Sequence, residues 1–538
     1  MLFLVVACAG PPRVATVDSI GIPAADGVRL AADVMLPVAG GGEPAPTVLI
    51  QTRYWRSFDM RVPDRPGHAP QGPRDGVADA LAEAGYAVVI VDVRGTGASE
   101  GEWRAPFAPV EVEDARAVLD WIVAQPWSDG RVGAYGVSYE GSTALLAAAT
   151  GHPALEAALA REVEWDLAGE ILTPGGLPLR AFAEEWGAAV AELDRGRVPS
   201  LFPPEAKYVV RGVRPLDDDP DGALLAARVA SRRVTDVAAA VAAVRGPTGA
   251  FGTSGWTVGE LGPRAHAAAL EATPTRLGLW GAWWDAATAL GVLRAYGELG
   301  STSLVDVRIG AWNHEGDAPM APFGAGTTVP VGEVVAWFDV WLRGAGSTPR
   351  AEWFEAGRDQ WHPLTGTSLV SGGYWLADGG RLSETPTRTA PEPVTVAPVV
   401  EGDRTRWSAG VLRAVQFTVP PGRGGVAWTS AALGADLRLA PGARLECAWS
   451  SEPAAAALVA RLEAVGPDAR TVGLTEAVVD AQAGRAEFLP VGVTVPAGWA
   501  LRVRLTGGDP ALFTLPHEGP ARWTAAGPCQ LGLNLLPS

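Results

Sequence analysis

The segment 136–141, Gly-Val-Ser-Tyr-Glu-Gly, places a serine where a strand would turn into a helix. The apolar run 131–135 precedes this segment, and the small residues of 142–150 follow it. In a strand–turn–helix elbow the Ser138 hydroxyl would be exposed above a sheet, where it could attack a carbonyl carbon. Gly136 fits this interpretation, because the turn crowds the backbone before the serine. The alternative is a helix start at which Ser138 caps the first backbone N–H groups.

A serine hydroxyl becomes a strong nucleophile only when a neighbouring base takes its proton. In one common arrangement an acid and then a histidine follow the serine along the chain, each just after a strand. His314 directly follows the predicted strand 303–310, in the segment 310–316. It is therefore the candidate base. The other histidines lie too early in the chain, in a helix-like segment or in the strand-rich C-terminal part: His68, His152, His266, His362 and His517.

An acid is needed to hold the imidazole in the correct tautomer. Asp285 ends the segment 280–285, Trp-Gly-Ala-Trp-Trp-Asp, after the predicted strand 275–281 and before a predicted helix over 286–299. This position favours Asp285 as the acid, although an aspartate there is also a common helix N-cap. Asp306 competes for the role, but it lies inside a strand pattern rather than at its end.

The oxyanion of an acyl-transfer reaction needs hydrogen-bond donors. The first candidate is the backbone N–H of Tyr139, the residue after the candidate nucleophile. The second is the hydroxyl of Tyr54, which lies in the loop 53–57 after the predicted strand 46–52. Together these two tyrosines could form the oxyanion hole.

Strands and helices that would position these residues alternate along the first part of the chain. The apolar runs 46–52, 86–93 and 132–135 predict buried strands of a parallel sheet. The segments 75–84 and 111–124 between them have the apolar spacing of amphipathic helices. This alternation predicts a doubly wound α/β architecture. Further expected elements are a hairpin over 14–38, strands over 155–160, 275–281 and 303–310, and a helix over 331–343.

The remaining sequence predicts two other kinds of structure. Alanine-rich stretches at 181–194 and 222–244 predict helices inside an insertion. After about residue 350 the chain has short strands separated by Gly, Pro and Asp turns, for example 412–419, 457–463 and 499–505, which predict a β-sandwich. The expected division is a signal or lipoprotein segment over 1–13, an α/β core in two parts over 14–165 and 266–348, a helical cap over 166–265, and the β-sandwich over 349–538.

Composition narrows the class of partner. The chain has 538 residues and a net charge of −17, which argues against a nucleic-acid backbone as partner. Its Cys and His spacing matches no metal site, and we expect no metal or other cofactor. Among its 21 tryptophans, four are candidates for lining a substrate pocket: Trp55, Trp165, Trp256 and Trp283.

The N-terminal segment indicates export. Residues 1–7 are apolar and end at Cys8, and the Val-Val-Ala-Cys sequence at 5–8 resembles the site at which bacterial lipoprotein precursors are cleaved and lipidated. We therefore expect an exported, membrane-anchored protein. The alternative is an incidental apolar tail on a cytoplasmic protein, because no Lys or Arg precedes the apolar stretch. Cys447 and Cys529 could pair in an oxidising compartment or remain buried thiols.

Several motifs together resemble the cocaine esterase and Xaa-Pro dipeptidyl-peptidase family of α/β-hydrolases. They are the segments 92–101, 121–133 and 136–141, followed by Trp-Trp-Asp at 283–285 and Trp-Asn-His at 312–314. The resemblance spans nearly the whole chain. It implies an α/β-hydrolase fold with a helical cap insertion, followed by a C-terminal jelly roll. It also implies that Asp285, His314 and Tyr54 are the acid, the base and the oxyanion tyrosine.

The chain departs from the family pattern at several positions. Arg53 stands where the family often has proline before the oxyanion tyrosine, and Glu140 replaces the small residue of the commoner elbow. Members that act on α-amino-acid esters hold the substrate ammonium with carboxylates just after the acid, whereas this chain has Ala-Ala-Thr at 286–288. Carboxylates at the cap entrance could supply that charge or could be structural: Glu162, Glu164 and Asp166.

The expected function is that of a cofactor-free serine hydrolase. It would cleave an ester or amide of a small molecule or short peptide through an acyl-enzyme. We favour an esterase over a dipeptidyl-peptidase, because no dedicated ammonium site can be located. The alternative of another class is a catalytically silent surface binding protein. Complete candidates for nucleophile, acid, base and oxyanion donors argue against that alternative. The oligomeric state is left open.

Overall fold

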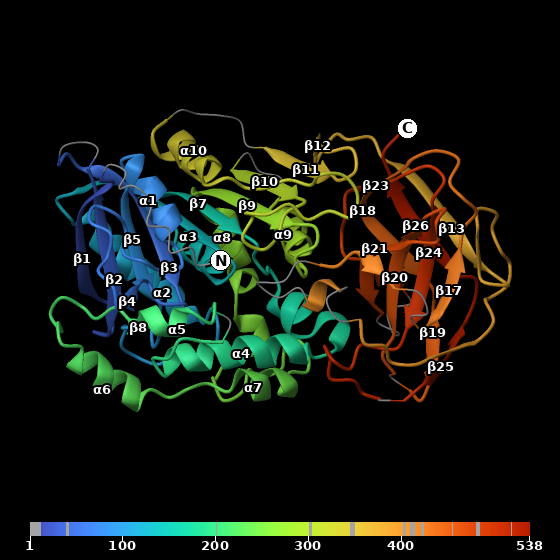
Figure 1. The fold of residues 1–538 in the computed structure, drawn as a ribbon, viewed down its shortest axis with the longest axis horizontal. Helices are drawn as coiled ribbons and strands as arrows, with labels where there is room; N and C mark the ends of the chain where they lie inside the picture. The colour runs from blue at the N-terminus through green and yellow to red at the C-terminus, as the bar shows by residue number, and fades with distance from the viewer. Residues whose placement is uncertain are drawn as a thin grey trace.

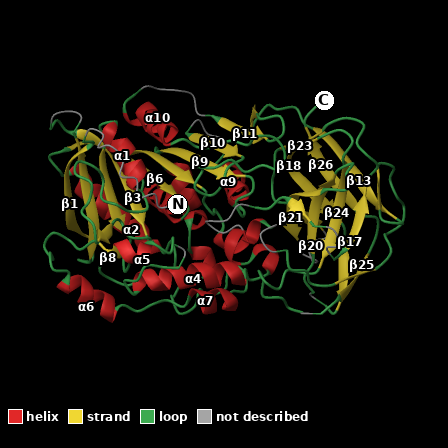
Figure 2. Cartoon of the chain, viewed as in Figure 1, coloured by secondary structure: helices red, strands yellow, loops and turns green. Residues whose placement is uncertain are grey.

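The structure is a computed structural model of the chain. Two strand-rich regions lie next to each other along its longest axis (Figure 1). The first carries helices on both faces of a sheet, whereas the second consists almost entirely of strands and loops (Figure 2). Within the described ranges, none of the helices has both the length and the apolar character needed to cross a bilayer. The structure describes residues 12–38, 42–200, 202–300, 304–344, 350–401, 405–408, 415–420, 424–454, 456–479, 485–517 and 519–537.

A ten-stranded sheet forms the first region, in the order β1-β2-β5-β3-β6-β7-β9-β10-β11-β12. Neighbours from β5 to β11 pair in parallel, whereas β1, β2 and β12 run antiparallel to their neighbours. Strands β3 and β5 are buried along their whole length, which explains their continuous apolar sequences. The predicted doubly wound sheet is confirmed. The strands are β1 (Val14–Pro23), β2 (Arg29–Pro37), β3 (Ala45–Thr52), β5 (Ala87–Asp92), β6 (Ser128–Val137), β7 (Leu155–Arg161), β9 (Arg276–Ala282), β10 (Val305–Gly310), β11 (Ala351–Glu355) and β12 (Gln360–Pro363).

Helices cover both faces of this sheet. Apolar residues of α1 and α10 pack on one face, and those of α2, α3 and α9 pack on the other. Helix α3 begins directly after β6, so the residue between them lies at the carboxyl edge of the sheet. These helices are α1 (Asp75–Glu83), α2 (Pro109–Val123), α3 (Tyr139–Ala149), α9 (Thr288–Glu298) and α10 (Val331–Leu342).

The insertion between β7 and β9 is largely helical, and its helices α4, α6 and α7 lie along one side of the molecule (Figure 1). The alanine-rich stretch 222–244 forms two helices. Helix α6 stops before Arg232, whose backbone is extended, and the Asp236 carboxylate caps α7 by accepting from the Ala239 N–H at 2.9 Å. The elements are α4 (Arg180–Asp194), α5 (Ala206–Val209), β8 (Val210–Val213), α6 (Ala223–Ser231), α7 (Val237–Ala243) and α8 (Ala267–Ala272), with short helical turns at Ala168–Leu172, Pro174–Gly176, Val258–Glu260 and Pro263–His266.

The sequence did not predict a two-stranded sheet that ties the insertion to the core. Strand β4 (Phe58–Met60) follows the loop after β3 and pairs antiparallel with β8. Both strands are too short to show an alternating pattern. The pairing holds the insertion next to the loop that carries Tyr54.

The C-terminal region contains an eleven-stranded sheet and a three-stranded sheet. The boundary expected at 349 is wrong by two strands, because β11 and β12 still belong to the first sheet. Alternation in a short strand does not reveal which sheet it joins. Of the expected strand 412–419, residues 412–414 lie outside the described residues. The strands are β13 (Val370–Ala377), β14 (Arg381–Ser383), β15 (Val394–Val396), β16 (Thr418–Val419), β17 (Val426–Thr429), β18 (Leu437–Glu446), β19 (Trp449–Glu452), β20 (Val459–Val465), β21 (Thr471–Val478), β22 (Arg485–Glu487), β23 (Val493–Val495), β24 (Ala500–Thr506), β25 (Ala521–Ala525) and β26 (Gln530–Leu535), with one more helical turn at Arg406–Ser408.

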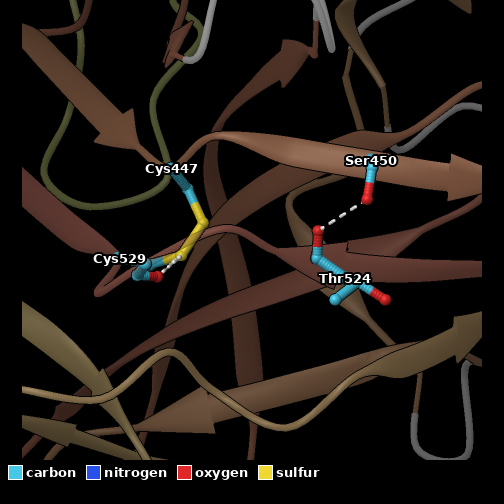
Figure 3. The surroundings of a disulfide bond; sticks show 5 residues. Cys447, Ser450, Thr524 and Cys529 are labelled. Atoms are coloured by element: carbon cyan, nitrogen blue, oxygen red, sulfur yellow. Dashed lines mark hydrogen bonds between the residues drawn. A yellow bond between two sulfur atoms is a disulfide. The ribbon is translucent and has the colours of Figure 1, made fainter.

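Cys447 and Cys529 form a disulfide bond in this region (Figure 3). Cys447 follows β18 and Cys529 precedes β26, and these two strands pair antiparallel. Both cysteines are buried. Nearby, the Ser450 hydroxyl donates to the Thr524 carbonyl oxygen at 3.3 Å, across the pair β19 and β25. Of the two alternatives for these cysteines, the structure contains the paired one.

Candidate active site

Ser138 lies on the sharp turn between β6 and α3. Its backbone has φ 60° and ψ −121°, a region that residues with side chains rarely adopt and that costs about 1–3 kcal/mol. A methyl group at Gly136 would collide with the backbone of Glu140, and one at Gly141 would lie 2.7 Å from the Arg161 carbonyl oxygen. Glycine at both positions therefore permits the turn. The Ser138 side chain makes no capping hydrogen bond to α3, so the structure does not support the N-cap alternative.

Asp285 and His314 are joined by a buried hydrogen bond. Asp285 lies in the loop after β9 and His314 in the loop after β10, and these neighbouring parallel strands end at the same edge of the sheet. The His314 Nδ1 lies 2.7 Å from a carboxylate oxygen of Asp285. Helix α9 begins only at Thr288, so Asp285 is not its N-cap. The competing acid, Asp306, instead accepts a hydrogen bond from the indole N–H of Trp280 at 3.2 Å.

The second ring nitrogen of His314 is available to take a proton. Its Nε2 is buried, and within the part of the chain that the structure describes it has no hydrogen-bond partner. Ser138 and Asp285 line the same cavity as His314, although no hydrogen bond joins the Ser138 hydroxyl to Nε2. The structure thus brings all three predicted residues to one cavity and links two of them directly.

The charges around His314 favour its protonated form. Burial disfavours the imidazolium, but the nearby carboxylates, with Asp285 foremost, together outweigh burial, so the pKa of His314 lies above its ordinary value. Glu315 and Glu162 act in the same direction. An imidazole that becomes more basic beside a buried carboxylate is suited to accept a proton from a hydroxyl.

Tyr54 and Tyr139 line the cavity beside Ser138. Tyr139 is the first residue of α3, where backbone N–H groups have no acceptor within the helix. The two tyrosine rings meet edge to face, with their centroids 6.1 Å apart. Burial and the nearby Glu140 raise the pKa of the Tyr54 hydroxyl, which keeps it protonated and able to donate. Both predicted oxyanion donors therefore lie at the cavity.

Three residues that the sequence analysis missed hold these tyrosines. The indole N–H of Trp186, on α4, donates to the Tyr54 hydroxyl at 3.0 Å. The indole N–H of Trp103 donates to the Tyr139 hydroxyl at 3.0 Å. That hydroxyl also lies 3.0 and 3.1 Å from the two carboxylate oxygens of Glu111, on α2. No sequence signal identified these contacts, because tertiary folding alone brings the partners together.

The two departures near the elbow have structural roles. The buried Glu140 carboxylate accepts from the Thr52 hydroxyl at 2.7 Å and from the Arg74 guanidinium at 2.9 Å. It thereby ties α3 to the end of β3 and to the segment before α1. The guanidinium of Arg53 is buried and pairs with Asp194 of α4 at 2.9 Å. Larger residues at these two positions therefore fit the fold.

The cavity that contains Ser138, Asp285 and His314 is called here the first cavity. The core, the insertion and the C-terminal region all contribute to its wall. Among the described residues, no group of three or more His, Cys, Asp or Glu side chains is arranged to hold a metal ion. Most of the first cavity's lining is apolar, including Phe107, Leu167, Ile171, Leu172, Phe251 and Trp407.

The prediction for the pocket tryptophans is wrong. The tryptophans that line the first cavity are Trp186 and Trp407. The cavity lining does not include the four predicted ones: Trp55, Trp165, Trp256 and Trp283. Trp165 and Trp283 are fully buried in the core, where their indole N–H groups donate to Glu298 at 2.8 Å and to the Phe354 carbonyl at 2.7 Å. A large aromatic residue in sequence shows burial, but it does not show which buried surface it joins.

Of the three carboxylates at the cap entrance, Glu164 alone lines the first cavity. Glu162 accepts a hydrogen bond from the indole N–H of Trp312 at 2.5 Å. Asp166 pairs with Arg264 at 2.9 Å. Burial raises the pKa of Glu164 to about 7. Glu162 and Asp166 therefore have structural roles, whereas Glu164 lies where it can contact a substrate.

Comparison with known proteins decides the family. The model of the X-Pro dipeptidyl-peptidase (S15) family matches residues 26–316, which is more than half of the chain. The chain belongs to this family. A Mycobacterium bovis protein named as a serine esterase is 30% identical to it over 429 residues, covering 72% of this chain and 67% of the relative. Cocaine esterase from Rhodococcus is 39% identical over 140 residues, covering 26% of this chain and 22% of the relative.

Solved structures share the fold of this S15-family chain. An aminopeptidase from a Thaumarchaeota archaeon has a TM-score of 0.74 at 18% identity, and an α-amino acid ester hydrolase has a TM-score of 0.72 at 18% identity. Both comparisons cover 99% of each chain. The S15-family chain is thus an α/β-hydrolase with a C-terminal strand-rich region. It is a serine hydrolase of the ester or X-Pro peptidase type, and its substrates are small-molecule esters or peptides.

Proposed function

We propose that the chain is an esterase in which Ser138 is the nucleophile, His314 the general base and Asp285 the residue that orients the imidazole. The observation that carries this proposal is the buried hydrogen bond between Asp285 and His314 Nδ1. The other ring nitrogen of His314, Nε2, has no hydrogen-bond partner among the described residues, and His314 lines the same cavity as Ser138. The strained backbone of Ser138 supports it independently.

The reaction would proceed in two steps. In the first, the Ser138 oxygen bonds to the ester carbonyl carbon, its proton passes to His314 Nε2, and the alcohol leaves with that proton. In the second, water gives a proton to the same nitrogen and its oxygen bonds to the acyl carbon. The bond from that carbon to the Ser138 oxygen then breaks, the Ser138 oxygen takes the proton from His314, and the acid is released. The backbone N–H of Tyr139 and the hydroxyl of Tyr54 would stabilise the oxyanion in both steps.

An ester fits the first cavity better than a peptide. A peptidase that recognises a free N-terminus needs several acceptors for the ammonium group. Most of this cavity is apolar, and among the described residues that line it Glu164 and Asp285 are the carboxylates. Glu164 is also the observation that keeps an X-Pro dipeptidyl-peptidase as the second candidate. Comparing kcat/KM for nitrophenyl butyrate and for Gly-Pro nitroanilide separates the two. We expect the ester to be preferred, and a strong preference for the anilide would reverse the ranking.

The nucleophile is tested by two serine variants, one on the elbow and one on the helix that follows it. Ser138→Ala should reduce kcat for nitrophenyl butyrate by roughly 10⁴-fold or more. The matched control is Ser142→Ala, because Ser142 is fully buried on α3 and does not line the first cavity. Equal activity of the wild type and Ser138→Ala would refute the assignment.

We also propose that the protein is exported and lipidated at Cys8. Residues 1–11 lie outside the described residues, so this proposal rests on the sequence and on the disulfide between Cys447 and Cys529. Disulfides persist mainly in oxidising compartments. In a bacterial host fed labelled palmitate, we expect the wild type to carry label in the membrane fraction and Cys8→Ser to lack it. Equal labelling of both proteins would contradict lipidation at Cys8.

A further inference from the structure

A second cavity, larger than the first, opens on Ser138 and His314. It shares four lining residues with the first cavity, and they include Tyr54 and Trp186. The hydrogen bond between Trp186 and Tyr54 therefore belongs to the wall of both cavities. The candidate nucleophile and base thus line both cavities.

The second cavity suits an uncharged, apolar group. Its wall includes Phe58 and Met60 of β4, Val210 of β8, and Ala189 and Leu193 of α4. The few polar atoms among these apolar side chains leave little to solvate a charge.

The charged side chains Arg74 and Glu315 of this wall are already paired. Arg74 pairs with Glu315 at 3.5 Å and with the buried Glu140 at 2.9 Å. Neither the Arg74 guanidinium nor the Glu315 carboxylate is therefore left without an opposite charge to attract an ionic substrate. A cationic or anionic group entering this cavity would lose its water and would have to compete with these ion pairs for a partner.

We propose that the second cavity binds the alcohol half of the ester, and that this alcohol is bulky, apolar and uncharged. The inference rests on the proposed esterase function. In the first step the bond from the Ser138 oxygen to the acyl carbon forms and the bond from that carbon to the alcohol oxygen breaks. The proton taken by His314 Nε2 passes to the alcohol oxygen, so the alcohol departs neutral.

The assignment of the two halves follows from the order of events. The alcohol must leave before water attacks, whereas the acyl group stays attached to Ser138. The larger second cavity has more room for a departing group, so the smaller first cavity, lined by Phe107, Leu172 and Trp407, is assigned to the acyl group. Tyr139, a candidate oxyanion donor, lines the first cavity and not the second, as expected if the carbonyl oxygen lies toward the acyl side.

Two substrate series test the assignment. One keeps the acyl group and enlarges the alcohol, from methyl acetate to benzyl acetate. The other keeps the alcohol and enlarges the acyl group, from methyl acetate to methyl hexanoate. Ala189→Phe fills the second cavity, because Ala189 is buried on α4 and lines it. We expect the kcat/KM ratio of benzyl to methyl acetate to fall by about tenfold or more. The ratio of methyl hexanoate to methyl acetate should not change.

Matched variants complete the design. Ala188→Phe places the same ring on the exposed face of the same helix and should change neither ratio. Leu172→Phe narrows the first cavity and should lower only the hexanoate ratio. If Ala189→Phe lowered the hexanoate ratio and left the benzyl ratio intact, the two halves would be reversed. If Ala189→Phe changed neither ratio, the second cavity would not be a subsite. Either result would overturn the inference.

A binding measurement separates this inference from the proposed function and does not depend on how Ala189→Phe folds. In Ser138→Ala protein, tryptophan fluorescence should report binding of benzyl alcohol, and benzylamine, which is cationic at neutral pH, should bind about tenfold more weakly or worse. Ester turnover by the wild type without alcohol binding would overturn this inference alone. Alcohol binding without turnover of any ester would overturn the proposed function and leave the ligand class standing.

Discussion

The indole N–H of Trp186 donates a 3.0 Å hydrogen bond to the hydroxyl oxygen of Tyr54. Because that oxygen accepts from the indole, the Tyr54 proton is left to point elsewhere, and Tyr54 lines the cavity beside Ser138. A helix of the insertion thus fixes the orientation of a candidate oxyanion donor that lies in the core.

Trp186→Phe should lower kcat by about three- to tenfold, because the ring remains to stack on Phe182 while the N–H is lost. Tyr54→Phe should lower kcat by about 10² to 10³, the usual effect of removing an oxyanion donor. In the Tyr54→Phe background, Trp186→Phe should have little further effect, because it acts through the hydroxyl. Additive losses in this double-mutant cycle would contradict the positioning role.

Glu111 should act on turnover through the Tyr139 side chain. Burial raises its pKa to about 8, so its carboxyl is mostly protonated at pH 7 and Glu111→Gln is close to isosteric. We expect Glu111→Gln to keep kcat within about threefold, and Glu111→Ala to lower it by about tenfold or more with little change in KM. Glu113→Ala, on the exposed face of the same helix, is the control. If Glu111→Ala lowered the melting temperature but left kcat unchanged, Glu111 would have a structural role only.

Asp285→Asn should shift the pH dependence of kcat/KM. A general base must be neutral, so activity rises as pH rises through the pKa of His314. Burial lowers that pKa, and the Asp285 carboxylate is the foremost of the groups that together raise it. Removing that negative charge lowers the pKa, and the rising limb should move to lower pH. The maximal rate should also drop by about 10⁴, because the imidazole loses its tautomer control. If the rising limb of the kcat/KM profile stayed in place or moved to higher pH, Asp285 would not be the carboxylate that raises the pKa of His314.

Glu164 should control selectivity for a cationic acyl group. Burial raises its pKa to about 7, so the carboxylate becomes ionised between about pH 6 and pH 8. The rate ratio for nitrophenyl esters of 6-aminohexanoate and heptanoate should rise over this range, because only the first substrate is cationic. The ratio cancels the titration of His314, which both substrates share. In Glu164→Gln the ratio should stay flat, and a rise that persisted there would exclude Glu164 as its cause.

The sequence predicted the order of strands and helices in the core well, because buried parallel strands such as β3 and β5 have continuous apolar sequences. It also placed Asp285 and His314 next to each other, because parallel strands end at one edge of a sheet. Their catalytic roles, and that of Ser138, stay predictions. The fold class and the hydrolase function are confirmed by the comparisons.

The rest depended on contacts that no local pattern specifies. The pairing of Phe58–Met60 with Val210–Val213 joins two strands too short for alternation to show. Trp186 and Trp165 are both tryptophans of the insertion, yet one lines the first cavity and the other is in the core. Which surface a tryptophan joins is decided by how the insertion packs, and sequence spacing does not encode that choice.

The most direct test locates the nucleophile chemically. Wild-type protein treated with a fluorophosphonate and digested with protease should carry a single adduct, on the peptide that contains Ser138, and His314→Ala should label much more slowly. We expect an adduct on the Ser138 oxygen. An adduct on another residue, or labelling that is equally fast without His314, would contradict it.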